Sequence, residues 1–258
     1  MKNIIVIVNQ KGGVGKTTTV LNLATALVQQ NRKKVLAGDI DPQGNATTGA
    51  GIEKNGLKYS VYDVLINNLA VKDVVVKSPT GKFDILPSNR NLAGAEIELV
   101  DLKKREFKLK KALAEVSANY DVILIDCPPS LSLLTLNALS AANYILVPIQ
   151  CEYYALEGLT DLLNTVRLMQ SKLNPELEFL GILRTMYDKR NNLAIQVSAQ
   201  LVEHFNEQVF YVSIPRAVRL AEAPSHGSTA VAIDPESAGA QSYLRLAREL
   251  LKRLKEAE

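Results

Sequence analysis

The stretch NQKGGVGKTTT, residues 9–19, follows an apolar run and opens a helical pattern. A strand, a glycine-rich turn and a helix in this order are the context that identifies a phosphate-binding loop. The ordinary motif, G-x-x-x-x-G-K-[ST], would place its first glycine at position 10. That position is Gln10, and a second lysine, Lys11, follows it. The loop therefore departs from the ordinary motif in two neighbouring residues, and the extra lysine needs a purpose.

The other residues of the loop suit phosphate chemistry. Its glycines free the backbone, so that N–H groups can wrap phosphate oxygens, and the helix that begins here directs its positive end at them. Lys16 would bring a charge to the β- and γ-phosphates, and the Thr17 hydroxyl is the expected Mg²⁺ ligand. The expected nucleotide-binding residues of the loop are Gly12, Gly13, Val14, Gly15, Lys16, Thr17 and Thr18.

Acidic residues follow two further apolar runs. Asp126 ends the run YDVILID, and Asp39 and Asp41 stand in GDIDPQGN. An acid at the carboxyl end of a parallel strand points into the crevice where ligands bind. Asp39 and Asp41 are two residues apart, so their side chains should lean to the same side. Acids this close to a phosphate loop suggest metal-binding and water-positioning roles; simple turn or capping roles are the alternative.

Strand-length apolar runs alternate with helical patterns along the whole chain. The strand candidates are residues 4–8, 35–39, 83–86, 122–125, 144–148, 177–183 and 209–214. The helical candidates are residues 15–30, 107–117, 131–141, 156–173, 193–205 and 240–255, with a short helix around residues 61–67. Continuous Ile/Val/Leu runs are typical of strands buried on both faces of a parallel sheet. The pattern predicts one α/β domain over residues 1–258, a doubly wound, mostly parallel sheet with helices on both faces.

Several classes are disfavoured by what the sequence lacks. It carries no protein-kinase motif set, no G-x-S-x-G nucleophile elbow and no dinucleotide fingerprint after its first strand. No apolar run reaches membrane-spanning length, so a cytoplasmic protein without a membrane anchor is expected. The two cysteines, Cys127 and Cys151, form no metal-binding motif. The net charge of +3 neither requires nor opposes a nucleic-acid partner. Residues 43–51 look like a mobile loop near the nucleotide.

Six segments together resemble the ParA/Soj family of deviant Walker A ATPases over nearly the whole chain. KGGVGKTT alone is shared with the wider superfamily, which includes MinD and the nitrogenase iron protein. The order and spacing of the six segments are specific to the chromosomal ParA/Soj branch. They are NQKGGVGKTTT, DIDPQGNATTG, YDVILIDCPPSLSLLTLNAL, ILRTMYDKRNNLAIQV, IPRAVRLAEAPSHG and GAQSYLRLARELL.

The resemblance implies an ATP-dependent homodimer in which ATP and Mg²⁺ lie between two chains. Lys11 corresponds to the signature lysine that reaches the partner's ATP and is counted with the catalytic and nucleotide-binding residues. Asp41 corresponds to the acid linked to the hydrolytic water, and Asp126 to the Walker B acid at the metal. Asp39 is expected to support the metal site. Asn45 would lie in the first switch loop and residues 128–130 in the second.

The resemblance also implies non-specific binding of double-stranded DNA by the dimer, and therefore a nucleoid-associated protein. The matching basic residues are Arg190 and Arg219, with Lys189 and Arg216 as helpers. A ParB-type centromere-binding protein would stimulate hydrolysis. The protein is expected to lack an N-terminal helix-turn-helix extension. The family's usual IPRNVR reads IPRAVR, so Ala217 removes an amide near the adenine, although backbone contacts around Pro215 could remain.

Two other readings of the superfamily remain open at this point. A MinD-like membrane ATPase would need an amphipathic tail helix, and the last helical pattern is amphipathic with a basic face. A helix docked on the core explains the same pattern. An electron carrier like the nitrogenase iron protein would need two cysteines per subunit placed to share a cluster across a dimer. Cys127 lies beside Asp126 and lacks the glycine-flanked context.

Overall fold

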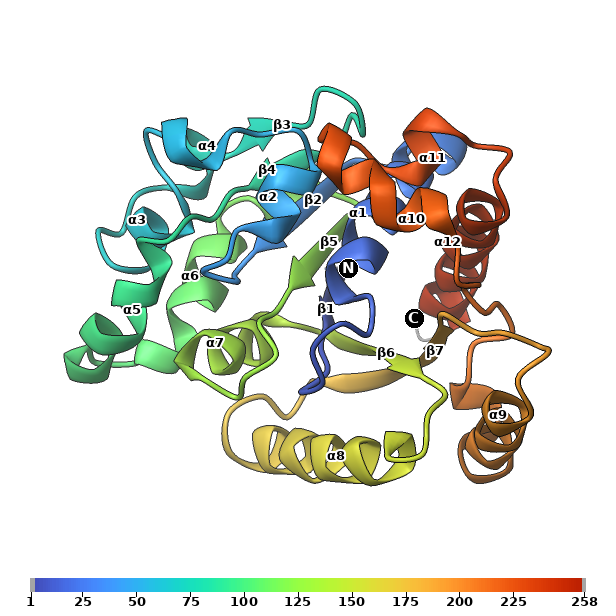
Figure 1. Cartoon of the computed structure of the whole chain (residues 1–258). Coiled ribbons are helices and arrows are strands. Elements are labelled where there is room, and N and C mark those ends of the chain that lie inside the picture. Colours follow the sequence, from blue (N-terminus) through green and yellow to red (C-terminus); the bar gives the residue numbers. More distant parts are fainter. Residues whose placement is uncertain (1–2, 257–258) are drawn as a thin grey trace.

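A seven-stranded sheet forms the centre of the molecule in the computed structural model, which describes residues 3–256 (Figure 1). The strand order is β3-β4-β2-β5-β1-β6-β7, and every neighbouring pair is parallel except β3 and β4. The strands are β1 Ile4–Ile7, β2 Val35–Asp39, β3 Val76–Lys77, β4 Asp84–Leu86, β5 Val122–Asp126, β6 Tyr144–Gln150 and β7 Glu178–Thr185. The predicted doubly wound, mostly parallel α/β fold is therefore confirmed.

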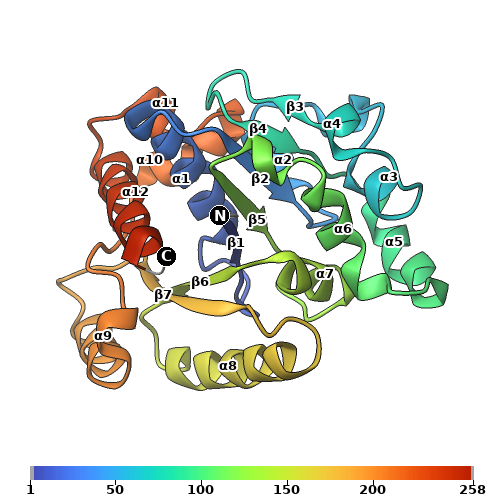
Figure 2. The same cartoon turned by 180° about the vertical axis from the view of Figure 1, so that it is seen from behind.

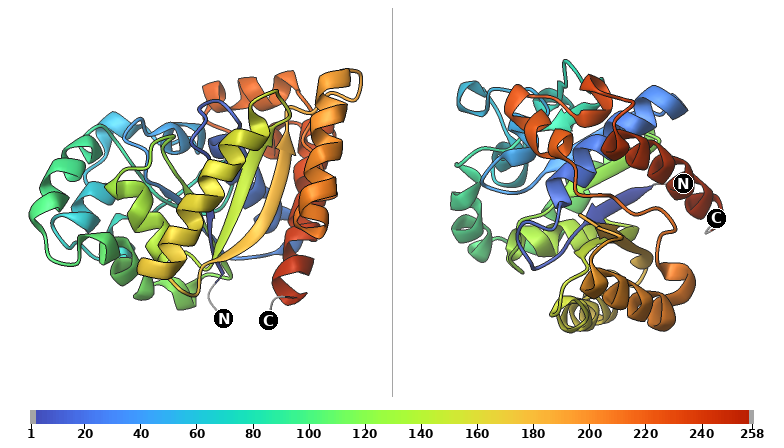
Figure 3. Two further views of the ribbon diagram at one scale, coloured as in Figure 1. Left: turned by 90° about the horizontal axis from the view of Figure 1, so that it is seen from below. Right: turned by 45° about the vertical axis from the view of Figure 1, so that its right-hand side comes forward.

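Helices cover both faces of this sheet. The longer ones are α1 Lys16–Asn31, α5 Leu92–Glu98, α6 Lys108–Ala114, α7 Leu133–Ala141, α8 Ala155–Lys172, α9 Asn192–Phe205 and α12 Ala238–Glu256. The shorter ones are α2 Asn45–Gly49, α3 Val61–Leu65, α4 Val71–Val74, α10 Val218–Glu222 and α11 Ala230–Ile233. Figures 2 and 3 show α1, α10, α11 and α12 on one face and α6, α7 and α8 on the other.

Two hydrophobic cores follow from this layering. All residues of β1, β2 and β5 are buried, because alternate side chains enter opposite cores. Ile5 and Ile7 pack with α1 and α12, whereas Ile4 and Val6 pack on the side of α7 and α8. This two-sided burial explains why the sequence shows continuous apolar runs and no alternation. It also fixes the carboxyl ends of β1, β2 and β5 side by side.

One predicted strand is wrong. Residues 209–214 form no strand: an isolated bridge joins Val209 to Ile182, and a second one joins Pro215, just beyond the segment, to Tyr187. Between these bridges the Glu249 carboxylate of α12 accepts hydrogen bonds from the backbone N–H groups of Tyr211 and Val212, at 2.8 and 3.0 Å. Because those N–H groups bond to a side chain, the segment cannot continue the ladder beside β7.

The loop predicted at residues 43–51 is also corrected, because it contains the helix α2. Its residues Ala46 and Thr47 are fully buried, and Thr47 is hydrogen-bonded to Asp39 of β2. Tertiary contacts, not helical periodicity, hold this five-residue helix. The strand β3 and the short helices α4, α10 and α11 escaped prediction for the same reason: each is too short to show a period.

Candidate functional site

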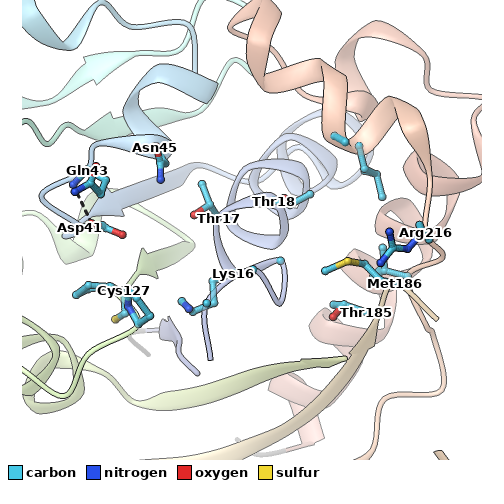
Figure 4. A pocket seen from close by; sticks show the side chains of 18 of the residues that line it. Lys16, Thr17, Thr18, Asp41, Gln43, Asn45, Cys127, Thr185, Met186 and Arg216 are labelled. Atoms are coloured by element: carbon cyan, nitrogen blue, oxygen red, sulfur yellow. Dashed lines mark hydrogen bonds between the residues drawn. The ribbon is translucent and has the colours of Figure 1, made fainter. Parts of the chain in front are cut away.

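A cavity of about 750 Å³ opens at the carboxyl ends of the central strands (Figure 4). Its size lies within the range of small-molecule sites in proteins. The segments around it include the loops after β1, β2 and β5, the end of β7 and the segment before α10. Its lining includes Gly12, Gly13, Gly15, Lys16, Thr17, Thr18, Asp41, Asn45, Cys127, Pro128, Pro129, Ser130, Pro215, Arg216 and Ala217. Most of the predicted site residues are thus brought together.

The glycine loop has the backbone that anion binding requires. Gly13 and Gly15 have φ of +74° and +88°, the left-handed region that favours glycine. Asn9 braces the turn, because its side chain accepts from Lys11 N–H at 2.9 Å and donates to the Pro148 carbonyl at 2.8 Å. The Thr185 hydroxyl donates to the Val14 carbonyl at 2.8 Å. The loop is therefore held from β6 and β7 while α1 begins at its end.

Lys16 is a buried cation of this cavity. Its ammonium donates to the carbonyls of Asn9 and Lys11 at 3.0 and 3.1 Å, and the residue is 7% exposed. Burial lowers the pKa of Lys16, and the nearby Asp126 opposes that shift. Figure 4 shows the side chain lying along the loop, where a bound phosphate chain would replace its carbonyl partners.

Thr17 and Asp126 form the pair expected at a metal. The Thr17 hydroxyl donates to Asp126 Oδ2 at 2.7 Å. The other carboxylate oxygen, Oδ1, is buried and accepts no hydrogen bond from any of the described residues. Burial raises the pKa of Asp126 well above its usual range, and the charge of Asp39 raises it further. An uncompensated buried carboxylate oxygen beside a hydroxyl fits a hard divalent cation such as Mg²⁺.

Asp39 and Asp41 occupy different environments. Asp39 is fully buried, accepts two hydrogen bonds from Thr47 at 2.8 Å, and is not among the residues that line the cavity. Burial raises the pKa of Asp39 to about 6, although the Thr47 bonds oppose the shift. Asp41 lines the cavity, and its Oδ1 accepts from Gln43 N–H at 2.9 Å. The metal role of Asp39 stays a prediction, whereas Asp41 has direct access to a ligand.

Lys11 lies outside the cavity of its own chain. Its side chain is 53% exposed and forms an ion pair with Glu152, which follows β6 and is 44% exposed. Sequence reasoning missed Glu152, since a single acid beyond a strand end gives no pattern. Its position just past the carboxyl end of an apolar run was the available signal. The two lysines of one loop thus have separate places, one buried beside the carboxylates and one half exposed at the rim.

The far end of the cavity is mainly apolar. Pro215 and Ala217 line it, as expected for the segment near a base, and Ala217 precedes α10. Thr185 and Met186 also line it and were missed, because neutral residues after a strand give no chemical signal. This end offers van der Waals contact to a base, and Arg216 is a charged side chain in its lining. The contact of Pro215 with adenine remains a prediction.

The predicted DNA-binding arginines are both exposed. Arg190 pairs with Asp188 through two nitrogens, at 2.9 and 3.0 Å, and this pairing lowers the pKa of Asp188 to about 2. Arg219 pairs with Glu222 and Asp234, each at 3.4 Å. Exposed pairs of this kind are weak, because water and salt screen them, so a phosphate could replace the acids.

A second cavity, of about 560 Å³, adjoins Arg190 but not Arg219. Its basic lining residues are Lys189, Arg190, Arg216 and Arg245. Arg245 of α12 was not among the predicted helpers, since it appears in sequence only as part of an amphipathic helix. Pro215 and Arg216 line both cavities. The basic cleft and the nucleotide cavity therefore share a wall.

Two features bear on the other readings of the superfamily. The apolar stripe of α12, which includes Tyr243, Leu246 and Leu250, is buried against the core that contains α1. Because that stripe is covered, the amphipathic pattern of α12 reflects a helix docked on the core, one of the two explanations that the sequence left open. None of the helices in residues 3–256 is long and apolar enough to cross a membrane. Cys127 and Cys151 are both buried.

Known proteins resemble this chain over most of its length. A family model described as an AAA domain matches residues 2–179. The sporulation initiation inhibitor protein Soj of Bacillus subtilis is 54% identical over 250 residues, which cover 97% of this chain and 98% of that protein. The chromosome partitioning protein ParA of Myxococcus xanthus is 49% identical, over 97% of this chain and 88% of its own.

A solved structure of similar shape contains a nucleotide. It is described as cobyrinic acid a,c-diamide synthase from Mycobacterium smegmatis with bound ATP analogue and magnesium. The TM-score is 0.87 at 37% identity, and the match covers 100% of this chain and 98% of the other. The fold, the phosphate loop with its paired carboxylates, and relatives near 50% identity over almost the full length lead to one assignment. The chain belongs to the ParA/Soj family of chromosome-partitioning ATPases.

Proposed function

We propose that this chain is a DNA-partitioning switch in which ATP binding assembles a sandwich dimer and the dimer binds DNA without sequence preference. Hydrolysis, stimulated by a ParB-type partner, releases the DNA. The observation that carries the proposal is the separation of the two loop lysines. Lys16 lies inside its own cavity, whereas Lys11 stands half exposed outside it. A lysine at the rim is placed to serve a second chain.

ATP would bind with its phosphates on the glycine loop and its base towards Pro215 and Ala217. The backbone N–H groups of the loop and the end of α1 would hold the phosphate oxygens, and Lys16 would neutralise them. Thr17 and Asp126 are the residues that would hold Mg²⁺, since they supply a hydroxyl and an uncompensated carboxylate oxygen. When bound, Mg²⁺ neutralises charge on the β- and γ-phosphates.

Asp41 is the group that would orient the attacking water. It lines the cavity beside α2, and its backbone carbonyl accepts hydrogen bonds from the Ser88 hydroxyl and from Gly44 N–H. These bonds fix the backbone from which the carboxylate extends. In phosphoryl transfer the protein acts chiefly by positioning the reactants and stabilising developing charge. Asp41 would supply the positioning, and Lys11 from the partner would add positive charge at the γ-phosphate.

DNA would be held by phosphate contacts from Arg190 and Arg219, one set from each subunit. Their present partners, Asp188, Glu222 and Asp234, are exposed and easily exchanged. The cleft lined by Lys189, Arg216 and Arg245 extends the basic surface next to Arg190. Cationic contacts of this kind bind any sequence, because phosphates carry no sequence information. Nucleoid association would follow from this binding.

DNA binding measured with ATP, with ADP and without nucleotide tests the proposal. We expect binding of mixed-sequence duplex only with ATP, and a steep fall in affinity between 50 and 200 mM salt, as counterion release requires. Gel filtration of the same samples should show a dimer only with ATP. A protein that binds ATP yet ignores DNA at low salt would contradict the proposed switch.

The variant Arg219→Ala should separate dimerisation from DNA binding. We expect the ATP-dependent dimer to form normally, while the salt slope of DNA binding falls by about 2, because each dimer loses two phosphate contacts. The affinity at low salt should fall by roughly tenfold or more. Fluorescence anisotropy against salt measures both. Arg167→Ala, which removes an exposed arginine of α8, is the matched control and should keep the wild-type slope.

A further inference from the structure

A chain of hydrogen bonds runs from β2 through α2 to the loop after β4 and ends on the backbone of Asp41. The Asp39 carboxylate accepts hydrogen bonds from both the N–H and the hydroxyl of Thr47, at 2.8 Å. The Thr47 hydroxyl accepts from the N–H of Ser88 at 2.8 Å. The Ser88 hydroxyl donates to the Asp41 carbonyl, also at 2.8 Å. Asp39, Thr47 and Ser88 are all fully buried.

The donors and acceptors in this series of hydrogen bonds can be arranged in one way only, because each hydroxyl has a single hydrogen to donate. The Thr47 hydroxyl donates its hydrogen to Asp39, and its oxygen accepts a hydrogen bond from Ser88 N–H. The Ser88 hydroxyl donates its hydrogen to the Asp41 carbonyl. The three residues are shielded from water, which would otherwise compete for these bonds. The chain therefore holds the Asp41 carbonyl in one orientation.

The Asp41 carbonyl is also held from within its own loop. It accepts a second hydrogen bond, from Gly44 N–H at 2.9 Å. Gly44 has φ of +63°, and a Cβ at this position would lie 2.9 Å from the Ser88 carbonyl oxygen. The loop after β2 and the loop after β4 can approach this closely because residue 44 has no side chain. Asp41 is thus clamped at its backbone while its carboxylate lines the nucleotide cavity.

We propose that Ser88 is a positioning residue for ATP hydrolysis: its hydroxyl fixes the Asp41 backbone and so sets where the Asp41 carboxylate stands at the attacking water. The inference rests on the proposed role of Asp41. Ser88 is not among the residues that line the cavity, so it acts through Asp41 and not on the nucleotide. A shift of about 1 Å in a reacting group can cost roughly 10²-fold in rate. Loss of the hydrogen bond from Ser88 to the Asp41 carbonyl should therefore lower kcat.

Ser88→Ala removes this hydroxyl and leaves the bond from Ser88 N–H to Thr47 in place. We expect kcat for ATP hydrolysis to fall about tenfold, a partial loss of positioning, with KM for ATP within about twofold of wild type. Ser78→Ala is the matched control. Ser78 is equally buried and its hydroxyl donates to the Ala50 carbonyl at 2.8 Å, at the other end of α2. Ser78→Ala should lower the free energy of unfolding in urea about as much as Ser88→Ala does, and it should keep the wild-type kcat.

The outcomes separate the inference from the function on which it rests. A wild-type kcat in Ser88→Ala, or an equal fall in kcat in Ser78→Ala, would overturn the positioning role. Asp41→Ala is assayed alongside. If Asp41→Ala is inactive while Ser88→Ala is normal, the inference about Ser88 alone fails. If Asp41→Ala hydrolyses ATP at the wild-type rate, the role of Asp41 fails, and the role of Ser88 fails with it.

Discussion

Asp41→Ala is expected to lower kcat for ATP hydrolysis by roughly 10²-fold or more, the usual contribution of a group that handles the attacking water. ATP binding should survive, because the phosphate loop, Lys16 and the pair of Thr17 with Asp126 do not depend on this side chain. The dimer should then persist with ATP and stay on DNA. Gel filtration and DNA binding over time after addition of ATP measure this trapped state.

The matched control for this variant is Asp73→Ala, which removes an exposed acid of α4 outside the cavity. It should hydrolyse ATP and release DNA as the wild type does. If Asp41→Ala instead turned over ATP normally, Asp41 would have only the turn-forming role that its hydrogen bond from Gln43 N–H also fits. A loss of ATP binding in Asp41→Ala would equally contradict the assigned role.

Lys11→Ala has the second large expected effect, the loss of the ATP-dependent dimer. In the isolated chain Lys11 is held by Glu152, and both side chains are about half exposed. An ion pair of that exposure contributes about 1 kcal/mol or less, whereas a triphosphate offers several negative charges to the same lysine. Lys11 should therefore leave Glu152 and bind the phosphates of the partner's ATP. Removing a cation that acts in trans on phosphoryl transfer costs about 10³-fold in kcat or more.

The control for Lys11→Ala is Lys33→Ala. Lys33 is also partly exposed and forms an ion pair with an acid, Asp121, but lies away from the nucleotide cavity. Analytical ultracentrifugation with and without ATP should show a dimer for Lys33→Ala and a monomer for Lys11→Ala. Normal ATP-dependent dimerisation of Lys11→Ala would remove the basis for assigning this lysine to the partner's site.

The sequence predicted most of the fold because the central strands are buried on both faces. Their continuous apolar runs are distinct from the helical patterns between them, and six of the seven runs are strands within a few residues of the predicted bounds. The phosphate loop stood out in the sequence because a strand, a glycine turn and a helix in this order are specific. Asp126 stood out because an acid at the carboxyl end of a parallel strand points into the crevice where ligands bind. The failed strand, residues 209–214, looks like the others. It fails because Glu249, far away in sequence, takes its N–H groups.

Residues that act through tertiary contacts could not be predicted. Glu152 meets Lys11 across 141 positions of sequence, and Ser88 meets Asp41 across 47. A single acid or serine after a strand carries no local pattern that names its partner. The helix α2 is a similar case: the hydrogen bonds from Thr47 to Asp39 stabilise it, and its five residues show no helical period. The family resemblance located Arg190 and Arg219, but the cleft that joins Arg190 to Arg245 required the structure.

The central claim is that Lys11 serves the ATP of the partner, and a mixing experiment tests it most directly. Lys11→Ala and Asp41→Ala are each expected to be inactive alone. In a mixed dimer, the site on the Lys11→Ala chain keeps its own Asp41 and receives Lys11 from the other chain. We predict that the two proteins, mixed before ATP is added, regain ATP hydrolysis well above the sum of their separate rates. If Lys11 acted within its own chain, each site of the mixed dimer would lack one group, and a mixture as inactive as its components would contradict the account.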